Sequence, residues 1–173
     1  MMEREKERVL EEVMIMYGDE LVRLAFHYVK NVETAKDIVQ STFIKCYQHL
    51  DSFRYKSSLK TWLYRITING CKDYLKSWHH RKVQAVQLIQ DVAGAIFSSV
   101  EDNVIQKEAK EELQQVVYTL PTIYREVIYL YYYQSFQIEE IADMMELNTS
   151  TVKTRLKRAR QRLKTKLEVN YHG

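Results

Sequence analysis

The sequence predicts an all-α fold: two small helical domains joined by a flexible linker, with a helix-turn-helix in the C-terminal domain. The first reason is composition, because a chain of 173 residues with one proline, four glycines and 28% charged residues suits amphipathic helices joined by short loops. The second is periodicity, because no alternating apolar and polar pattern persists over six or more residues. With 46% hydrophobic residues, the chain can bury one good core or two small ones.

The first domain is expected to cover residues 1–82. Its central helix is predicted from Val32 to Leu50, where a helical stripe of small and apolar side chains recurs. This stripe consists of Ala35, Ile38, Val39, Thr42 and Cys46. Residues 51–58 interrupt the pattern, and a further helix begins near Leu59 and continues towards Trp78.

The linker is predicted at residues 83–99, where the helical periodicity weakens. The second domain is expected at residues 100–173, because Ser99 is followed by an acid in the pattern of a capped first helical turn.

The acidic and basic residues are unevenly distributed along the second half of the chain. Residues 81–150 carry 5 Lys or Arg against 11 Asp or Glu, whereas residues 151–173 carry 8 against 1. A basic end of this kind indicates a contact with nucleic acid.

The second domain is expected to contain four helices, at about 100–119, 121–133, 138–145 and 149–166. Pro121 fits the first turn of its helix, where the missing N–H costs little. The last two patterns are typical of a helix-turn-helix. Their facing apolar residues are Ile138, Ile141, Ala142 and Met145 on the first helix, Leu147 in the turn, and Val152 and Leu156 on the second helix.

The second helix of this motif is predicted to enter the major groove of DNA by its N-terminal turn. Asn148 is placed to cap that turn by accepting a hydrogen bond from a backbone N–H. Five residues are then expected near base edges or the flanking phosphates: Thr151, Lys153, Thr154, Lys157 and Arg158. Four other cations are assigned to phosphates or to surface solvation: Arg155, Arg160, Arg162 and Lys164.

Two other interpretations of the basic helix compete with DNA binding. A run of charges is often only a solvated surface, but here a capped turn and a complementary preceding helix accompany it. A helix lying on a membrane surface is disfavoured, because the apolar stripe contains no Trp or Phe.

A second candidate surface lies on the helix that begins near Leu59. One face of this helix mixes an aromatic, an amide and cations, and it consists of Trp62, Arg65, Asn69, Lys72 and Lys76. Such a face suits single-stranded DNA, because bases stack on aromatic rings and cations follow the backbone. Another face carries Leu63, Thr67, Tyr74 and Trp78. An aromatic core with solvated lysines explains the same pattern equally well, so both interpretations stay open.

The sequence gives no support for catalysis, a metal or a cofactor. Cys46 and Cys71 lack metal-site spacing and are expected to be reduced and partly buried. There is no phosphate-binding glycine loop and no H-E-x-x-H, and the histidines are scattered apart from one adjacent pair. No signal peptide and no membrane-spanning run is apparent, which favours a cytoplasmic protein without membrane insertion.

Several motifs in order resemble the extracytoplasmic-function (ECF) sigma factors of bacterial RNA polymerase, over about Tyr17 to Leu167. DIVQSTF, residues 37–43, resembles the core-binding helix of region 2, and SFRYKSSLKTWLYRITIN, residues 52–69, resembles the promoter-melting segment. LPTIYREVIYL and EEIADMMELNTSTVKTRLKRAR resemble region 4. The resemblance implies a sigma factor that binds core RNA polymerase, selects promoters and promotes DNA melting.

The resemblance also implies roles for particular residues. The core-binding residues would be Asp37, Gln40 and Phe43, which would contact the clamp helices of the polymerase large subunit. Phe53 and Asn69 would meet the separated strand of the −10 element, in a pocket around them. The −35 element would be read by Lys153, Thr154, Lys157 and Arg158. An anti-sigma factor, which can be membrane-bound, is a further implied partner.

The chain departs from the family pattern at two positions. Ser41 replaces the acid that usually follows the Gln of the core-binding motif, and Glu146 replaces the usual glycine in the turn of the helix-turn-helix. A non-glycine residue at positive φ costs on the order of 1 kcal/mol. A stand-alone helix-turn-helix regulator is the alternative to a sigma factor, and association with core polymerase distinguishes the two.

Overall fold

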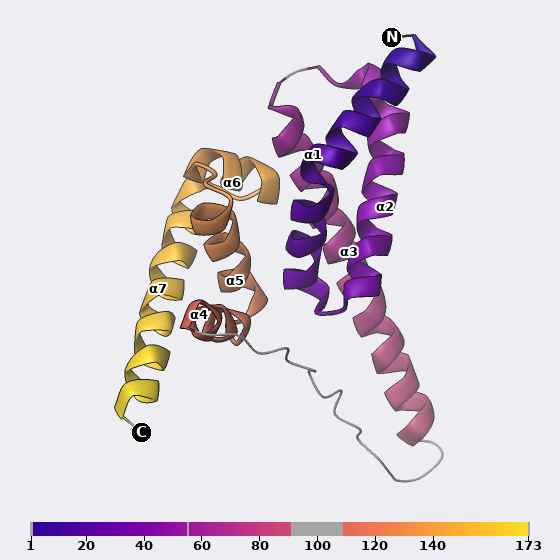
Figure 1. Ribbon diagram of the computed structural model, residues 1–173. Coiled ribbons are helices and arrows are strands. Elements are labelled where there is room, and N and C mark those ends of the chain that lie inside the picture. Colours follow the sequence, from indigo (N-terminus) through magenta and orange to yellow (C-terminus); the bar gives the residue numbers. More distant parts are fainter. Residues whose placement is uncertain (1, 55, 91–108, 173) are drawn as a thin grey trace.

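The structure is a computed structural model that describes residues 2–54, 56–90 and 109–172, and every regular element within them is helical (Figure 1). This confirms the predicted all-α class. The elements are α1 (Glu3–Val29), α2 (Val32–His49), a 3₁₀ turn (Leu50–Ser52), α3 (Leu59–Gln90), α4 (Ala109–Tyr118), α5 (Thr122–Ile128), a π-helical turn (Tyr129–Tyr133), α6 (Ile138–Met145) and α7 (Thr149–His172).

Helices α1, α2 and α3 form one bundle, called here the N-terminal block (Figure 1). The sharp turn between α1 and α2 has Lys30 in the left-handed region, and Asn31 caps α2 by accepting a hydrogen bond from the Thr34 N–H at 2.9 Å. The stripe predicted for α2 is buried as expected. Cys46 and Cys71 are both free, as the sequence predicts, and they are completely buried where partial burial was expected.

Helices α4 to α7 form the C-terminal block, which packs around α5. Arg125 of α5 is buried, and its guanidinium donates to the backbone carbonyls of Tyr118 at 2.8 Å and Leu120 at 3.3 Å. These bonds satisfy the carbonyl of the last residue of α4 and a carbonyl of the turn that follows it. Pro121 is the N-cap of α5, one residue before the predicted position in the first turn.

Two predicted bounds differ from those in the structure. Helix α3 continues to Gln90, so residues 83–90 of the predicted linker are helical. Helix α7 continues to His172, six residues beyond the predicted end at Lys166. Residues 91–99, and the predicted helix start near Val100, lie outside the described residues. The division of the chain into 1–82, 83–99 and 100–173 stays a prediction.

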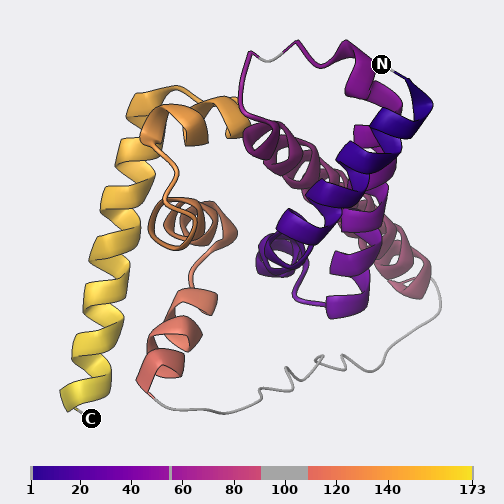
Figure 2. The same ribbon diagram turned by 45° about the horizontal axis from the view of Figure 1, so that its top comes forward.

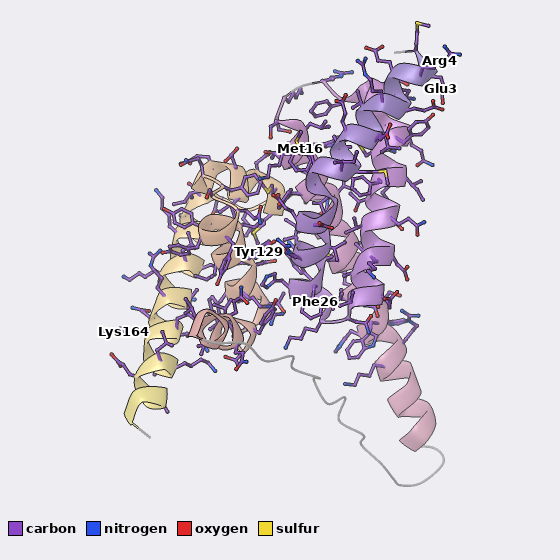
Figure 3. The ribbon with its side chains drawn as sticks, in the orientation of Figure 1. Glu3, Arg4, Met16, Phe26, Tyr129 and Lys164 are labelled. Atoms are coloured by element: carbon purple, nitrogen blue, oxygen red, sulfur yellow. The ribbon has the colours of Figure 1, made fainter. Side chains whose placement is uncertain are left out.

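The two blocks pack against each other, with α1 against α5 and α3 against α6 (Figure 2). Aromatic side chains fill much of this contact, and Figure 3 labels two of them, Phe26 and Tyr129. The His27 ring lies 4.9 Å from the ring of Tyr118 and 4.2 Å from that of Tyr129. Buried apolar residues of both blocks therefore form one continuous core.

His27 should make stability fall at acidic pH. Burial and the charge of Arg125 lower the pKa of His27 from 6.5 to about 4. The native state therefore resists a proton that the unfolded state takes up below pH 6.5, so the stability contributed by this group is complete above pH 6.5 and is lost towards pH 4. Relative to His27→Phe, the wild type should lose about 2 kcal/mol of unfolding free energy between pH 7.5 and pH 5, measured by urea denaturation. An identical pH dependence for both proteins would contradict the assignment.

Candidate nucleic-acid and polymerase interfaces

The helix-turn-helix predicted from the sequence is present at α6 and α7. Residues 138–145 form α6 with the predicted bounds, and Asn148 accepts a hydrogen bond from the Thr151 N–H at 3.0 Å, which confirms the predicted cap. The apolar face of α7 is buried, with Val152, Leu156 and Ala159 between 0% and 2% exposed. The cap and this stripe fix both the start and the rotation of α7, so its other faces are set by the fold.

The turn between α6 and α7 adopts the left-handed conformation that the sequence predicted. Glu146 has φ 54° and ψ 42°, where the family pattern has glycine. Its backbone N–H still contacts the Ala142 and Asp143 carbonyls at the end of α6. Leu147 is partly buried against the core, as expected of the residue in the turn. The motif therefore forms at the cost of one strained residue.

The predicted −35 residues lie together on the exposed part of the first turns of α7. Lys153, Thr154, Lys157 and Arg158 are exposed, and Thr151 is half-buried beside the cap. Among the residues that the structure describes, no acidic side chain lies within ion-pair distance of Lys153, Lys157 or Arg158. This placement suits contact with a polyanion, and the roles of these residues stay a prediction.

Arg155 is a correction to the sequence interpretation, which assigned it to phosphates or to solvent. Its Nη1 donates to Glu126 Oε1 at 3.0 Å, and Glu126 is only 3% exposed. The other carboxylate oxygen of Glu126 accepts from the Tyr28 hydroxyl. Burial raises the pKa of Glu126, while the Tyr28 hydrogen bond and the nearby charges of Lys72 and Arg155 lower it. Arg155 therefore neutralises a buried acid.

The predicted single-strand surface contains a pocket of about 500 Å³ between the end of α2, the segment 52–57 and the start of α3. Its aromatic wall is Phe53 stacked on Trp62, with ring centroids 4.9 Å apart and planes 27° apart. The basic residues lining it are Lys45, His49, Arg54, Lys56 and Arg65, and no acid is among the described residues that line it. An aromatic pair surrounded by cations is chemically suited to a base and its phosphates.

The predicted face of α3 does not lie wholly in this pocket. Trp62 and Arg65 line it, but Asn69 does not, so the pocket expected around Phe53 and Asn69 is centred instead on Phe53 and Trp62. Asn69 and Lys76 are exposed further along α3, and Lys72 is half-buried. The charge of Lys72 acts on Glu126 of the C-terminal block. The strand-binding roles of these residues stay predictions.

The opposite face of α3 forms an aromatic and apolar core, as one of the two interpretations expects, over only part of its length. Leu63 and Thr67 are completely buried, whereas Trp78 is 46% exposed with Lys82 Nζ 4.9 Å from its ring centroid. Tyr74 is partly buried against the core. The core interpretation therefore holds for the middle of α3 and fails near Trp78, because α3 extends past α1 and α2 at this end (Figure 1).

The three predicted polymerase-binding residues lie on different sides of α2. Gln40 is exposed and Phe43 is 7% exposed, and both line an apolar groove of about 840 Å³ between α1 and α2. Asp37 is exposed with Ser41 at a smaller pocket between α2 and α3. Phe43 therefore acts mainly as core, and the exposed apolar surface of the groove comes from Met14 and Ile44, 48% and 53% exposed.

Sequence reasoning missed most of the cations around the single-strand pocket. Lys45 and His49 come from the end of α2, and Arg54 and Lys56 come from the irregular segment before α3. A helical wheel of α3 cannot find residues that belong to other elements. The one available signal was the local series of Phe53, Arg54 and Lys56, in which cations follow an aromatic residue directly.

Comparison with known proteins identifies both blocks. Residues 14–82 match the family model for Sigma-70 region 2, and residues 110–163 match that for Sigma-70, region 4. These two regions define the class: a sigma factor of bacterial RNA polymerase.

Curated relatives then narrow the class. The chain is 32% identical to the ECF RNA polymerase sigma factor SigW of Bacillus subtilis over 90% of this chain and 87% of the relative. It is 33% identical to SigM of the same organism, over 90% and 93%, and 33% identical to the ECF sigma-E factor of Escherichia coli K12, over 90% and 85%. The chain belongs to the ECF sigma factors.

Solved structures share the fold. The sigma factor RpoE of Bartonella quintana, in complex with the anti-sigma factor NepR, superposes with a TM-score of 0.67 at 24% identity, covering 92% of this chain and 96% of that chain. CnrH, in complex with the cytosolic domain of CnrY, superposes with a TM-score of 0.65 at 23% identity, covering 94% of this chain and 90% of that chain.

The helices of the described residues include none with an apolar stretch that could span a bilayer.

Replacing Glu146 with glycine should stabilise the helix-turn-helix. The variant Glu146→Gly removes the left-handed strain and an acid from the negative end of the α6 dipole, so the free energy of unfolding should rise by about 1 kcal/mol. The matched control is Glu139→Gly in the exposed first turn of α6, which should lower it by about 1 kcal/mol. Urea denaturation followed by circular dichroism measures both. A loss of stability in Glu146→Gly would contradict the strain argument.

Proposed function

We propose that this ECF sigma factor directs core RNA polymerase to promoters through two DNA-binding surfaces of different chemistry. The observation that carries the proposal is their presence on one chain: a capped helix-turn-helix with exposed cations, and a cation-lined pocket with a stacked aromatic pair. The first suits duplex DNA and the second suits an unpaired strand. A protein that holds both forms of DNA can stabilise an opened promoter.

The first surface reads the −35 element in the major groove. Lys157 and Arg158 lie on the exposed side of α7, about two turns after the capped Thr151, and can reach guanine edges or the flanking phosphates. Thr151, Lys153 and Thr154 complete the surface. Arg155 is paired with Glu126 and therefore contributes no phosphate contact. The slope of log affinity against log salt concentration is expected to be smaller by the contribution of one charge.

The second surface binds the separated strand of the −10 element. A flipped base would stack against Phe53 and Trp62, while Arg54, Lys56 and Arg65 face its phosphates. Base stacking is worth roughly 1–3 kcal/mol per base, which offsets part of the cost of unstacking the duplex. Further along α3, Asn69, Lys72 and Lys76 extend the path of the strand.

Core polymerase docks on α2 and the groove between α1 and α2. Gln40 and the exposed apolar side chains of Met14 and Ile44 form one contact, and Asp37 forms a second on the other side of the helix. Exposed apolar side chains of this kind are typical of a binding surface. Ser41 is exposed beside Asp37, so α2 contributes one carboxylate to that contact, and Asp73 of α3 lines the same pocket.

An anti-sigma factor is a further proposed partner. The solved relatives RpoE and CnrH are described in complex with NepR and with the cytosolic domain of CnrY. The protein itself makes and breaks no bond in this proposal and needs no cofactor, because its work is binding and strand separation. It acts in the cytoplasm, where promoters and polymerase are present.

The test of this function is transcription with core polymerase, the purified protein and a library of promoter fragments. We expect transcripts that start at defined positions, and only when the protein is present. DNA binding without any association with core polymerase would instead favour a stand-alone helix-turn-helix regulator.

Arg158→Ala should weaken recognition of the −35 element. The loss of a bidentate contact to guanine is worth roughly 1–3 kcal/mol, so holoenzyme affinity for its promoter should fall by about ten-fold. The variant should lose little on a promoter with a scrambled −35 element. Lys166→Ala, an exposed cation further along α7, is the matched control and should behave as wild type. An equal loss on both promoters would show that Arg158 contacts phosphate and does not read a base.

Trp62→Ala should impair strand capture and leave duplex binding intact. Affinity for a single-stranded −10 oligonucleotide should fall by about ten-fold, and permanganate reactivity of thymines in the opened region should fall with it. Trp78→Ala is the matched control, because Trp78 lies on the same helix, is exposed and does not line the pocket. Asn69→Ala tests whether the strand continues along α3. Normal opening by Trp62→Ala, with its fold intact by circular dichroism, would contradict the pocket assignment.

A further inference from the structure

The single-strand pocket holds more positive charge than one phosphate of a strand requires. Lys45, Arg54 and Lys56 line the pocket and are exposed. Within the part of the chain that the structure describes, no acid lies within ion-pair distance of any of the three. Arg65, which also lines the pocket, is already paired with Asp143 of α6. Three cations, from α2 and from the segment before α3, are therefore available to an anion at this one site.

A strand and a free nucleotide present their phosphates differently to such a site. A strand carries a single phosphate for each nucleotide, and the neighbouring phosphates follow the strand away from the pocket. A nucleoside di- or triphosphate instead carries its phosphates in direct sequence on one sugar. Because the attraction between charges grows as their separation falls, clustered cations favour the ligand whose charge is more concentrated.

The aromatic wall of the pocket suits the base of the same ligand. Phe53 and Trp62 stack with their ring centroids 4.9 Å apart, and both residues line the pocket. Both are half-buried, so part of this wall is open to solvent. A base can stack on it whether or not it belongs to a strand, since every base has a π-face. The pocket volume of about 500 Å³ lies within the range of roughly 300–1,000 Å³ that is common for small-molecule sites.

We infer that the single-strand pocket also binds a free nucleoside di- or triphosphate. The base stacks on the wall of Phe53 and Trp62, and the phosphates face Lys45, Arg54 and Lys56. The binding follows from the chemistry of the pocket, whereas its consequence, competition with the −10 strand, rests on the proposed function. Free nucleotides therefore lower the apparent affinity of the free protein for single strands. In a promoter complex the other contacts make strand binding effectively intramolecular, so a nucleotide competes less well there.

The first test uses the two tryptophans of the chain as separate reporters. Trp78→Phe leaves Trp62 as the only tryptophan, and ATP without Mg²⁺ should quench its fluorescence in a saturable way at millimolar concentration, because adenine stacks on the ring. Trp62→Phe is the matched control, because Trp78 is 46% exposed, has Lys82 over its ring and does not line the pocket. Equal quenching in both variants would show general attachment of ATP to aromatic and cationic surfaces and would overturn the inference.

The second test separates the contribution of the base from that of the phosphates. Inorganic triphosphate lacks a ring to stack on Trp62, so ATP should bind roughly ten-fold more tightly when both are measured by isothermal titration calorimetry. Adenosine lacks the phosphates and should bind more weakly than ATP. Equal affinities for ATP and inorganic triphosphate would show a site for anions only, and the inference would then be wrong.

The third test removes the cations one at a time. Arg54→Gln and Lys56→Gln should each lower the affinity for ATP by roughly two- to five-fold at low salt, as expected for exposed charged contacts. Lys36→Gln is the matched control, since Lys36 is an exposed cation of α2 outside the pocket and the change of charge is the same. Circular dichroism checks that each variant is folded. An equal fall in all three variants would show only an effect of net charge and would contradict the assignment.

Competition is measured with the free protein and a fluorescent single-stranded −10 oligonucleotide. At an oligonucleotide concentration well below its dissociation constant, ATP should release it with a midpoint equal to the dissociation constant of ATP. Binding of ATP without release of a bound oligonucleotide would place the nucleotide outside the strand surface and overturn the inference.

The failure of this inference is distinguishable from that of the proposed function. A protein that binds ATP but binds no strand and never initiates transcription with core polymerase would fail the proposed function alone. A protein that binds the strand and initiates normally, while ATP leaves the fluorescence of Trp62 unchanged, would overturn the nucleotide site alone.

Discussion

One buried carboxylate, that of Glu126, constrains most of the C-terminal block. A charge that is 3% exposed must be paired and hydrogen-bonded, because leaving it alone in an apolar core costs several kcal/mol. Its partners come from two other elements: Arg155 from α7 and Tyr28 from α1. All three elements must therefore keep one arrangement for the acid to be satisfied. The rotation of α7 and the docking of the two blocks depend on the same side chain.

This constraint explains why one arginine of a basic helix is unavailable to DNA. Arg155 comes three residues after Val152 and directly before Leu156, at the edge of the stripe that packs on α5 and α6. Lys157 and Arg158 lie further round the helix and stay exposed. The apolar stripe decides the rotation, and the rotation decides which cations face solvent. Charge count alone therefore overstates the surface available to a polyanion.

The features that the sequence predicted well are local. The bounds of α6, the Asn148 cap and the left-handed Glu146 each depend on residues within four positions, where the physics of helix ends is sufficient. The pairing of Arg155 with Glu126 joins residues 29 positions apart, and that of Arg65 with Asp143 joins residues 78 apart. A helical wheel shows that a cation lies outside the apolar face of its helix. It does not show which residues of other elements lie next to that cation. For the same reason it left open whether Trp78 belongs to a core, which in the structure ends before the helix does.

The charge distribution along the chain has a consequence for specificity. Both proposed DNA surfaces are cationic, and cationic surfaces bind any DNA through its phosphates. Asp143 and Glu126 belong to the acidic part of the chain, residues 81–150, and both act on cations of α3. Under the proposed function, acids in these positions reduce the attraction of the α3 surface for phosphates, and so weaken its sequence-independent binding to DNA. Once a larger enzyme fixes both surfaces at the spacing of a promoter, their linkage makes binding of the second element effectively intramolecular. If both surfaces bind as proposed, selectivity arises because either surface alone binds weakly and the correctly spaced pair binds strongly.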